Sequence, residues 1–161
     1  MFDPFFIWVE STAFSVWMRE SVSLFAFPGI LTAHTIGLGL IAGIDMAHDL
    51  RVLGVAPRVP VVEFNRFLPF MWFGLWLNVI TGIALLIAYP TKALTNPVFY
   101  LKLSLIAVAL LMMKPIRRRA AANLPSTRRL AVASLVCWAS AITAGRLLAY
   151  TYFKLSTLDE F

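Results

Sequence analysis

The sequence contains little charge, a single cysteine and only two histidines among its 161 residues. Asp, Glu, Lys and Arg make up 14% of the chain, whereas a soluble domain usually carries roughly 25%. Cys137 excludes a disulfide framework within the chain and is expected to be a small packing residue. Because 60% of the residues are hydrophobic and the mean hydropathy is +0.81, an ordinary water-soluble domain is excluded. The composition indicates a protein that faces lipid.

Several functional signatures are also missing. The start, MFDPFFIWVE, has no positively charged region, so it is not expected to be a signal peptide. The glycine run GLGLIAG lies inside an apolar stretch and follows no strand, which argues against nucleotide binding. No serine, histidine and carboxylate are expected to converge, so a non-catalytic role is favoured over an enzyme. The basic residues flank apolar stretches, as in membrane proteins, and nucleic-acid binding is therefore not expected.

Four apolar stretches are long enough to cross a bilayer core, which needs about 20 residues and tolerates about 17. They cover approximately residues 28–50, 67–89, 98–113 and 130–152. Pro28 and the pair Asn96-Pro97 are typical of helix starts. The connecting stretches are too short for a second domain. The sequence therefore predicts an all-α membrane protein, a bundle of four transmembrane helices that forms one domain over residues 1–161.

Residues 3–20 form a pattern of a different kind. Apolar residues share one helical face at spacings of three and four, and polar residues lie opposite; the apolar set is Phe2, Phe6, Val9, Ala13 and Trp17, and the polar set is Ser11, Ser15 and Arg19. This pattern predicts an amphipathic helix in the membrane interface, with Trp8 and Trp17 at the headgroup level. The alternative is the amphipathic start of a longer first span.

The loops after the first and third spans hold nine basic residues: Arg51, Arg58, Arg66, Lys114, Arg117, Arg118, Arg119, Arg128 and Arg129. Because Lys and Arg accumulate in cytoplasmic loops, this side is predicted to be the cytoplasm. Both termini are then periplasmic, and the expected location is the bacterial inner membrane, with lipid as an obligatory partner.

Both histidines lie in the stretch AHTIGLGLIAGIDMAHDLR. His34 and His48 are fourteen positions apart, a rotation about 40° short of four helical turns, so they share a face near opposite membrane surfaces. The intervening residues of that face are Gly37, Ile41 and Asp45. A GxxxG pair, Gly39 and Gly43, lies roughly opposite and would let another helix approach closely.

The spacing of His34 and His48 is similar to that of the paired histidines on a ligand helix of the dihaem cytochromes b. The resemblance implies haem b as cofactor, with one axial ligand offered to each of two haems and Gly37 leaving space beside the ring. With no further histidine in the chain, bis-histidine ligation would require a homodimer. Alternatively, His48 is an interfacial residue that pairs with Asp45 and reaches water. His34 can equally be a packing residue that bonds to a carbonyl or to Thr81.

Lys102 and Arg146 are expected at about the depth of His34. Cations in hydrocarbon are costly and require anionic partners. Haem propionates would satisfy both residues, and Asn78 could add a polar contact or bond to a neighbouring helix. The alternatives are cations that snorkel to the surface, or salt bridges to Glu10 or Glu20.

The chain as a whole resembles a family of small bacterial four-helix membrane proteins of unknown function. The matching segments are FAFP, HTIGLGLIAG, HDLRVLG, TGIALLIA, NPVFYLKLSLI and WASAITAGRLLAYTY. The pattern is also distantly similar to the copper-resistance type of membrane domain. The resemblance places His34, Asp49, Arg51, Lys102 and Arg146 at characteristic polar positions of the family. It does not include His48, which favours one site over two.

These observations leave three functional hypotheses. The first is a haem-binding electron-transfer subunit, homodimeric or part of a membrane complex, with a redox partner on the periplasmic side. The second is a non-catalytic anchor for another protein. The third is a transporter of a small solute or metal.

Overall fold

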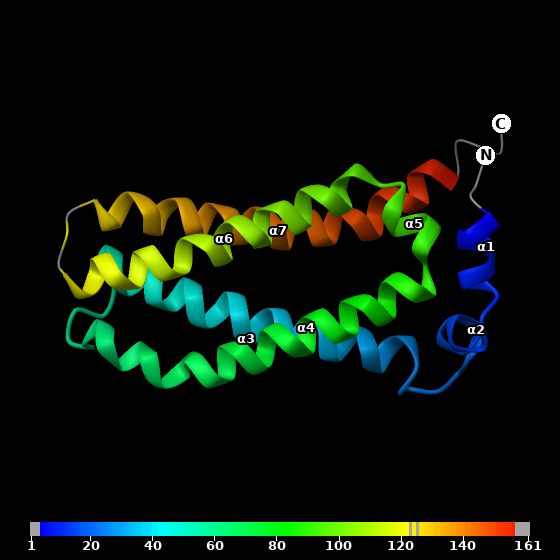
Figure 1. Cartoon of the computed structure of the whole chain (residues 1–161), viewed down its shortest axis with the longest axis horizontal. Coiled ribbons are helices and arrows are strands. Elements are labelled where there is room, and N and C mark those ends of the chain that lie inside the picture. Colours follow the sequence, from blue (N-terminus) through cyan, green and yellow to red (C-terminus); the bar gives the residue numbers. More distant parts are fainter. Residues whose placement is uncertain (1–3, 123, 125, 157–161) are drawn as a thin grey trace.

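The computed structural model describes residues 4–122, 124 and 126–156, and within them every element is helical. Four long helices run side by side along the molecule: α3 (Phe27–Leu53), α4 (Leu68–Ala88), α6 (Pro97–Ala121) and α7 (Thr127–Ser156) (Figure 1). A 3₁₀ helix, η1 (Val61–Phe67), leads directly into α4. All four long helices are long and apolar enough to cross a membrane. The predicted all-α bundle is confirmed, and the protein is a multi-pass membrane protein.

The bundle consists of two helical hairpins. Helix α3 packs along α4, α6 packs along α7, and the two hairpins meet mainly where α3 contacts α7. Two glycines bring α3 and α4 together, because a Cβ on Gly37 would lie 2.8 Å from the Gly74 carbonyl oxygen, and one on Gly74 would lie 2.9 Å from the Gly37 carbonyl oxygen. Backbones that approach this closely are typical of helix pairs in membranes.

The helix boundaries follow local sequence features. Pro28 and Pro97 occupy the first turns of α3 and α6, and the Asn96 side chain caps α6 by accepting a bond from Val98 N at 2.9 Å. Helix α3 ends at Gly54, whose φ of 109° suits a residue without Cβ. Helix α6 continues past the predicted end of the third span at residue 113 and includes Pro115, which removes one backbone hydrogen bond without ending the helix.

The prediction of a single N-terminal helix over residues 3–20 is wrong in one respect. The structure has two short helices, α1 (Pro4–Glu10) and α2 (Ala13–Glu20), separated at Ser11 and Thr12. Ser11 Oγ donates to the Trp8 carbonyl at 2.8 Å, and Thr12 Oγ1 donates to the Val9 carbonyl at 2.7 Å. Hydroxyls that bond to nearby carbonyls compete with a continuous helix, and Thr12 then caps α2.

Helices α1 and α2 lie across one end of the bundle, which we call the α1/α2 end (Figure 1). Their polar side chains contact the protein. Ser15 is fully buried and donates to the Ala88 carbonyl at 3.2 Å, and Arg19 donates to the same carbonyl at 2.9 Å. The aromatic side chains point outward, with Trp8 64% exposed. The polar face therefore attaches the two helices to the bundle and leaves the aromatic face for the membrane interface.

A short helix, α5 (Pro90–Leu94), connects α4 to α6 at this end. The Thr91 N–H donates to Glu10 Oε1 at 3.3 Å, so α5 is also linked to α1. The Lys92 ammonium lies 5.5 Å from the centroid of the Tyr89 ring, and burial lowers the pKa of Lys92.

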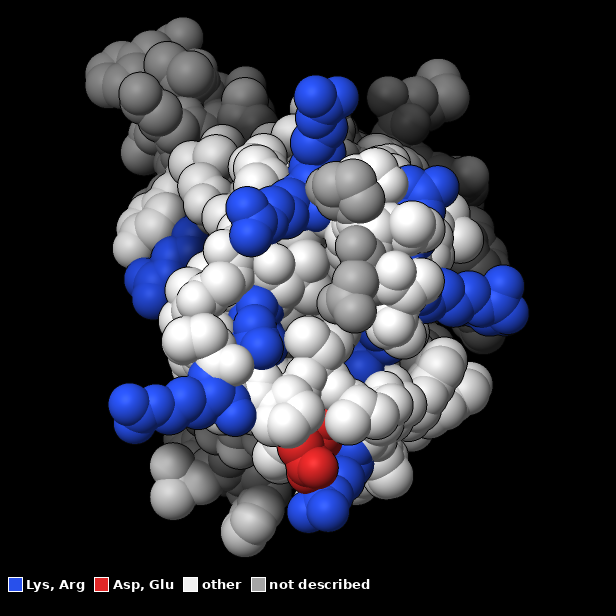
Figure 2. Space-filling view, turned by 90° about the vertical axis from the view of Figure 1, so that its left-hand side faces the viewer, with Lys and Arg blue, Asp and Glu red and all other residues white. Residues whose placement is uncertain are grey.

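The opposite end of the bundle carries the α3–η1 and α6–α7 connections, and we call it the basic end. Figure 2 shows this end, with Lys and Arg side chains spread around it and little acidic surface. The acidic residue of η1, Glu63, forms an ion pair with Arg66 at 3.1 Å. The uneven distribution of charge between the two ends agrees with the distribution expected from the sequence.

Candidate functional site

Helix α3 presents one polar face to the interior of the protein. Gly37, Ile41, Asp45 and His48 are all buried, and His34, one turn before Gly37, is half-buried. The predicted shared face is therefore the face that packs inside the bundle. It carries two polar clusters: a His34 cluster (His34, Asn78, Thr81 and Lys102) toward the α1/α2 end, and an Asp45 cluster (Asp45, His48, Asp49, Arg117 and Trp138) toward the basic end.

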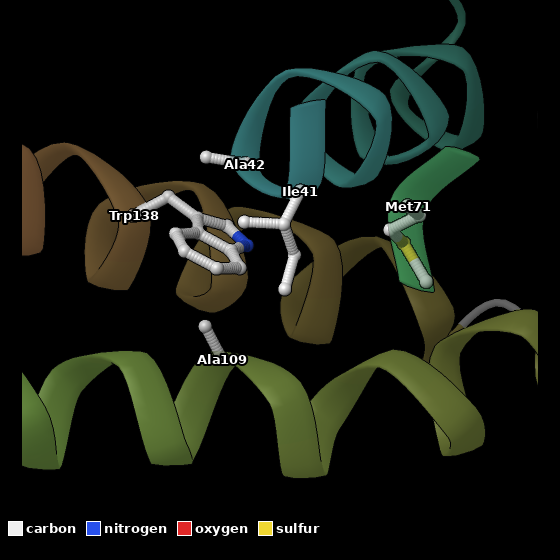
Figure 3. Close-up of a cluster of buried hydrophobic side chains, with 5 residues drawn as sticks. All are labelled: Ile41, Ala42, Met71, Ala109 and Trp138. Atoms are coloured by element: carbon white, nitrogen blue, oxygen red, sulfur yellow. The ribbon is translucent and has the colours of Figure 1, made fainter. Parts of the chain in front are cut away.

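An apolar core separates the two clusters. Its buried members come from all four long helices, and the core consists of Ile41, Ala42, Met71, Ala109 and Trp138 (Figure 3). The Trp138 indole is fully buried and lies between α3 and α6, with Ile41 and Ala42 on one side and Ala109 on the other. This side chain closes the middle of the bundle.

The imidazole of His34 is held by two oxygen atoms of α4. Its Nδ1 lies 3.1 Å from the Asn78 carbonyl oxygen and 3.1 Å from Thr81 Oγ1. The Thr81 hydroxyl donates its own hydrogen to the Leu77 carbonyl at 2.6 Å, so it can only accept from His34. With two acceptors around it, Nδ1 carries the proton of a neutral imidazole. The predicted bonds to a carbonyl and to Thr81 are confirmed.

This arrangement leaves Nε2 as the basic nitrogen of His34. The Asn78 amide nitrogen lies 3.4 Å from Nδ1 and 3.5 Å from Nε2, but it donates its short bond, 2.8 Å, to the His34 carbonyl oxygen. Asn78 therefore connects α3 to α4, as one of its predicted roles required. Gly82 provides space for the ring, because a Cβ at that position would lie 3.2 Å from His34 Cε1.

Of the two predicted cations, the structure brings Lys102 into this region. Lys102 is partly buried and acts electrostatically on His34. Its side chain passes along Gly145 of α7, where a Cβ would lie 3.6 Å from Lys102 Cε. Arg146 is exposed, and it makes no hydrogen bond or ion pair with other residues that the structure describes. Neither cation forms the predicted salt bridge to Glu10 or Glu20 within those residues.

Helix α7 lines this half of the bundle with small side chains. Among the side chains of α7 that the structure describes, the buried residues beyond Trp138 are Ala141 and Ala144, followed by the partly buried Gly145. Gly37, which was predicted to lie beside a cofactor, has its Cα against α4 and serves helix packing. The small residues near His34 and Lys102 are therefore Gly82 and Gly145, which the sequence analysis did not single out.

The Asp45 cluster is more deeply buried than the His34 cluster. Asp45, His48 and Asp49 are each 2% exposed or less. Trp138 Nε1 donates to Asp45 Oδ2 at 2.9 Å, and His48 Nδ1 lies 3.5 Å from Asp49 Oδ1. The prediction that His48 is an interfacial residue that reaches water is wrong. The reason is η1, which folds over the last turns of α3 and places the Phe64 ring edge-on to the imidazole, 5.7 Å between centroids.

Arg117 of α6 supplies the positive charge near the two carboxylates. It acts electrostatically on both Asp45 and Asp49, while one of its nitrogens donates to Asn65 Oδ1 at 3.4 Å. The direct contacts are incomplete within the described residues, because Asp45 Oδ1, both Asp49 oxygens and two Arg117 nitrogens have no hydrogen-bond partner. Buried polar groups of this kind are usually satisfied by water or a ligand.

The sequence analysis did not identify this second cluster. It grouped Arg117 with the surface run Arg117–Arg119 and gave Trp138 no polar role. The available signal was the pair Asp45 and Asp49, because two carboxylates on an apolar helix require a cation or donors from another helix. What hydropathy does not provide is the identity of the partner helix.

The two histidines lie in separate clusters, and among the described residues no three His, Cys, Asp or Glu side chains are placed to hold a metal ion. Ligation of a haem by one histidine does not require such a group. No known protein family matches the chain, and neither the curated proteins nor the solved structures include a similar one. The family resemblance stays a prediction, and the function must be argued from the two clusters.

Proposed function

We propose that the protein is a membrane subunit that binds haem b for electron transfer, and that His34 Nε2 would hold the iron. The observation that supports this proposal is the position of Nδ1 between two acceptors of α4. Histidines that bind metals commonly donate their second N–H to a carbonyl, which fixes the ring and leaves the other nitrogen basic. Bound haem would supply the one-electron chemistry.

The surroundings of His34 also suit the cofactor. Lys102 is a cation at apolar depth without an ion pair to any described residue, and a haem propionate is an anion of the required kind. The exposed Arg146 would bind the second propionate nearer to the membrane surface. Gly82 and Gly145 add no side chain beside His34 and Lys102, which suits a site for a flat ring.

A single haem for each chain is the version that we favour. The other imidazole, His48, is enclosed between Asp49 and the Phe64 ring at the closely packed basic end. A homodimer formed through Gly39 and Gly43 would not bring a second His34 to the same iron. The two glycines lie about 140° and 180° around the helix from His34. A shared haem would therefore require a contact through a different face.

The test is an absorption spectrum of protein expressed with excess haem and purified in detergent. We expect a Soret band with about one haem per chain, lost in His34→Ala and retained in the matched variant His48→Gln. Lys102→Gln should retain the band but lower the affinity for haem, because one propionate loses its counter-ion. A colourless protein, or a Soret band unchanged in His34→Ala, would overturn the proposal.

The Asp45 cluster favours a second candidate function, proton-coupled transport of a small solute. Carboxylates and histidines buried in membrane helices often form proton relays. Asp45, His48 and Asp49 provide such groups on one helix. Purified protein in liposomes with an internal pH dye should then show a proton flux that Asp49→Asn abolishes. A flux that persists in this variant would exclude the cluster as its route.

A further inference from the structure

A cavity of about 500 Å³ opens at the basic end of the molecule. It lies between the last turn of α3, the start of η1 and the connection from α6 to α7. Two arginines and several apolar side chains line it: Arg51, Arg128, Val52, Val61, Ala120 and Leu124. Neither the His34 cluster nor the Asp45 cluster contributes to it, so its role is independent of haem binding.

The guanidinium of Arg51 is fixed before any ligand arrives. Its Nε donates to the Val59 carbonyl, and its Nη2 donates to the Pro57 carbonyl at 3.0 Å. The loop folds around the side chain with the help of two residues in the left-handed region, Gly54 and Ala56, with φ of 109° and 51°. A cation that is already immobilised loses little further entropy when it binds an anion.

The second arginine approaches from α7. Arg128 is exposed in the first turn of this helix and forms no ion pair within the described part of the chain. The acidic side chain of η1, Glu63, is paired with Arg66. The cavity therefore carries two positive charges, in the basic surface that Figure 2 shows.

We propose that this cavity binds the phosphate group of an anionic phospholipid. Arg51 and Arg128 would bind the phosphate oxygens through charge-assisted hydrogen bonds. Val52, Val61 and Leu124 form an apolar wall for the glycerol and the first methylenes of the acyl chains. The position agrees with this ligand, because the cavity lies where apolar helices end and lipid headgroups begin. A free phosphate ion would leave the apolar wall uncovered.

The experiment measures lipid binding to the purified full-length protein by native mass spectrometry, with phosphatidylglycerol and phosphatidylcholine of the same acyl chains. The key variant is Arg128→Gln. Its matched control is Arg129→Gln, which removes the same charge from the neighbouring exposed position outside the cavity. Arg51 is left unchanged because it also holds the loop.

We expect the wild-type protein and Arg129→Gln to prefer phosphatidylglycerol. Arg128→Gln should bind this lipid about tenfold more weakly, because one charge-assisted hydrogen bond is lost. Equal binding of the two lipids would overturn the proposal. An equal loss in both variants would also overturn it, because it would show attraction to the basic surface alone. Full competition by millimolar inorganic phosphate would assign the cavity to free phosphate instead of lipid.

Discussion

The two halves of the bundle are built differently. Toward the basic end, large side chains and ionisable groups are completely enclosed, as Trp138, Met71, Asp45 and Asp49 show. Toward the α1/α2 end, the interior residues of α7 are small, and the ionisable residues of the cluster, His34 and Lys102, are only partly buried. The difference indicates that the first half determines how the hairpins associate, whereas the second half places fewer packing constraints on them.

The energetic reason lies in the cost of buried charge. Two carboxylates inside a membrane protein require donors and a cation. Trp138 supplies one donor to Asp45, and Arg117 supplies the nearby positive charge, each from another helix. An arrangement that depends on three helices at once fixes the position of each one. The His34 cluster obtains its hydrogen bonds from α4 alone, so it places no such requirement on the second hairpin.

The largest effect is expected for Trp138→Ala, which tests whether the basic half holds the hairpins together. The substitution empties the core between α3 and α6 and leaves Asp45 Oδ2 without its donor. We expect the free energy of unfolding in mixed detergent micelles to fall by about 3–5 kcal/mol.

The variant Trp138→Phe separates packing from hydrogen bonding. It keeps most of the ring volume and loses only the indole N–H, so a smaller loss of about 1–3 kcal/mol is expected. If both variants unfolded like the wild-type protein, the basic half would not be the stabilising half.

A smaller effect is expected at the α3–α4 contact. Gly37→Ala places a Cβ 2.8 Å from backbone atoms of α4 and forces the two helices apart. We expect this to lower the free energy of unfolding by about 1–3 kcal/mol. Gly43→Ala on the same helix meets no atom within 4 Å and is the matched control. It should be neutral or stabilising by up to about 1 kcal/mol. A Gly43→Ala variant as unstable as Gly37→Ala would show that another helix covers that face.

The smallest effect is expected for Thr81→Val, which removes one of the two acceptors around His34 Nδ1. The shape of the side chain is kept, and the Asn78 carbonyl still holds the ring. The free energy of unfolding should therefore fall by only about 1 kcal/mol. Thr35→Val, on an exposed position of α3, is the control for the general effect of the substitution. A loss of several kcal/mol would mean that His34 also stabilises the bundle.

The sequence predicted the spans well because crossing a membrane needs a long apolar stretch, and hydropathy detects such stretches directly. The bond from His34 to Thr81 was also among the expected alternatives, since few polar partners exist at that depth. The burial of His48 was not foreseen. It depends on η1 folding back over α3, and nothing in the residues around His48 encodes that contact.

The N-terminal helices show a related limit. The pattern of residues 3–20 predicts a polar face opposite an apolar one, of which Phe2 lies outside the described residues. It does not specify which face contacts the protein. Ser15 and Arg19 bind carbonyls at the end of α4, and these acceptors are available only after the bundle has formed. A face that looks suited to water can therefore be the face that contacts the protein.

Both polar clusters depend on α3, which lies between α4 and α7. His34 and Asp45 are eleven residues apart on this helix, about 16 Å along its axis. Any sliding or rotation of α3 would stretch the bonds to Thr81 and to Trp138 in the same movement. A movement of α3 along its axis would therefore disturb both polar clusters together, although they lie near opposite ends of the bundle.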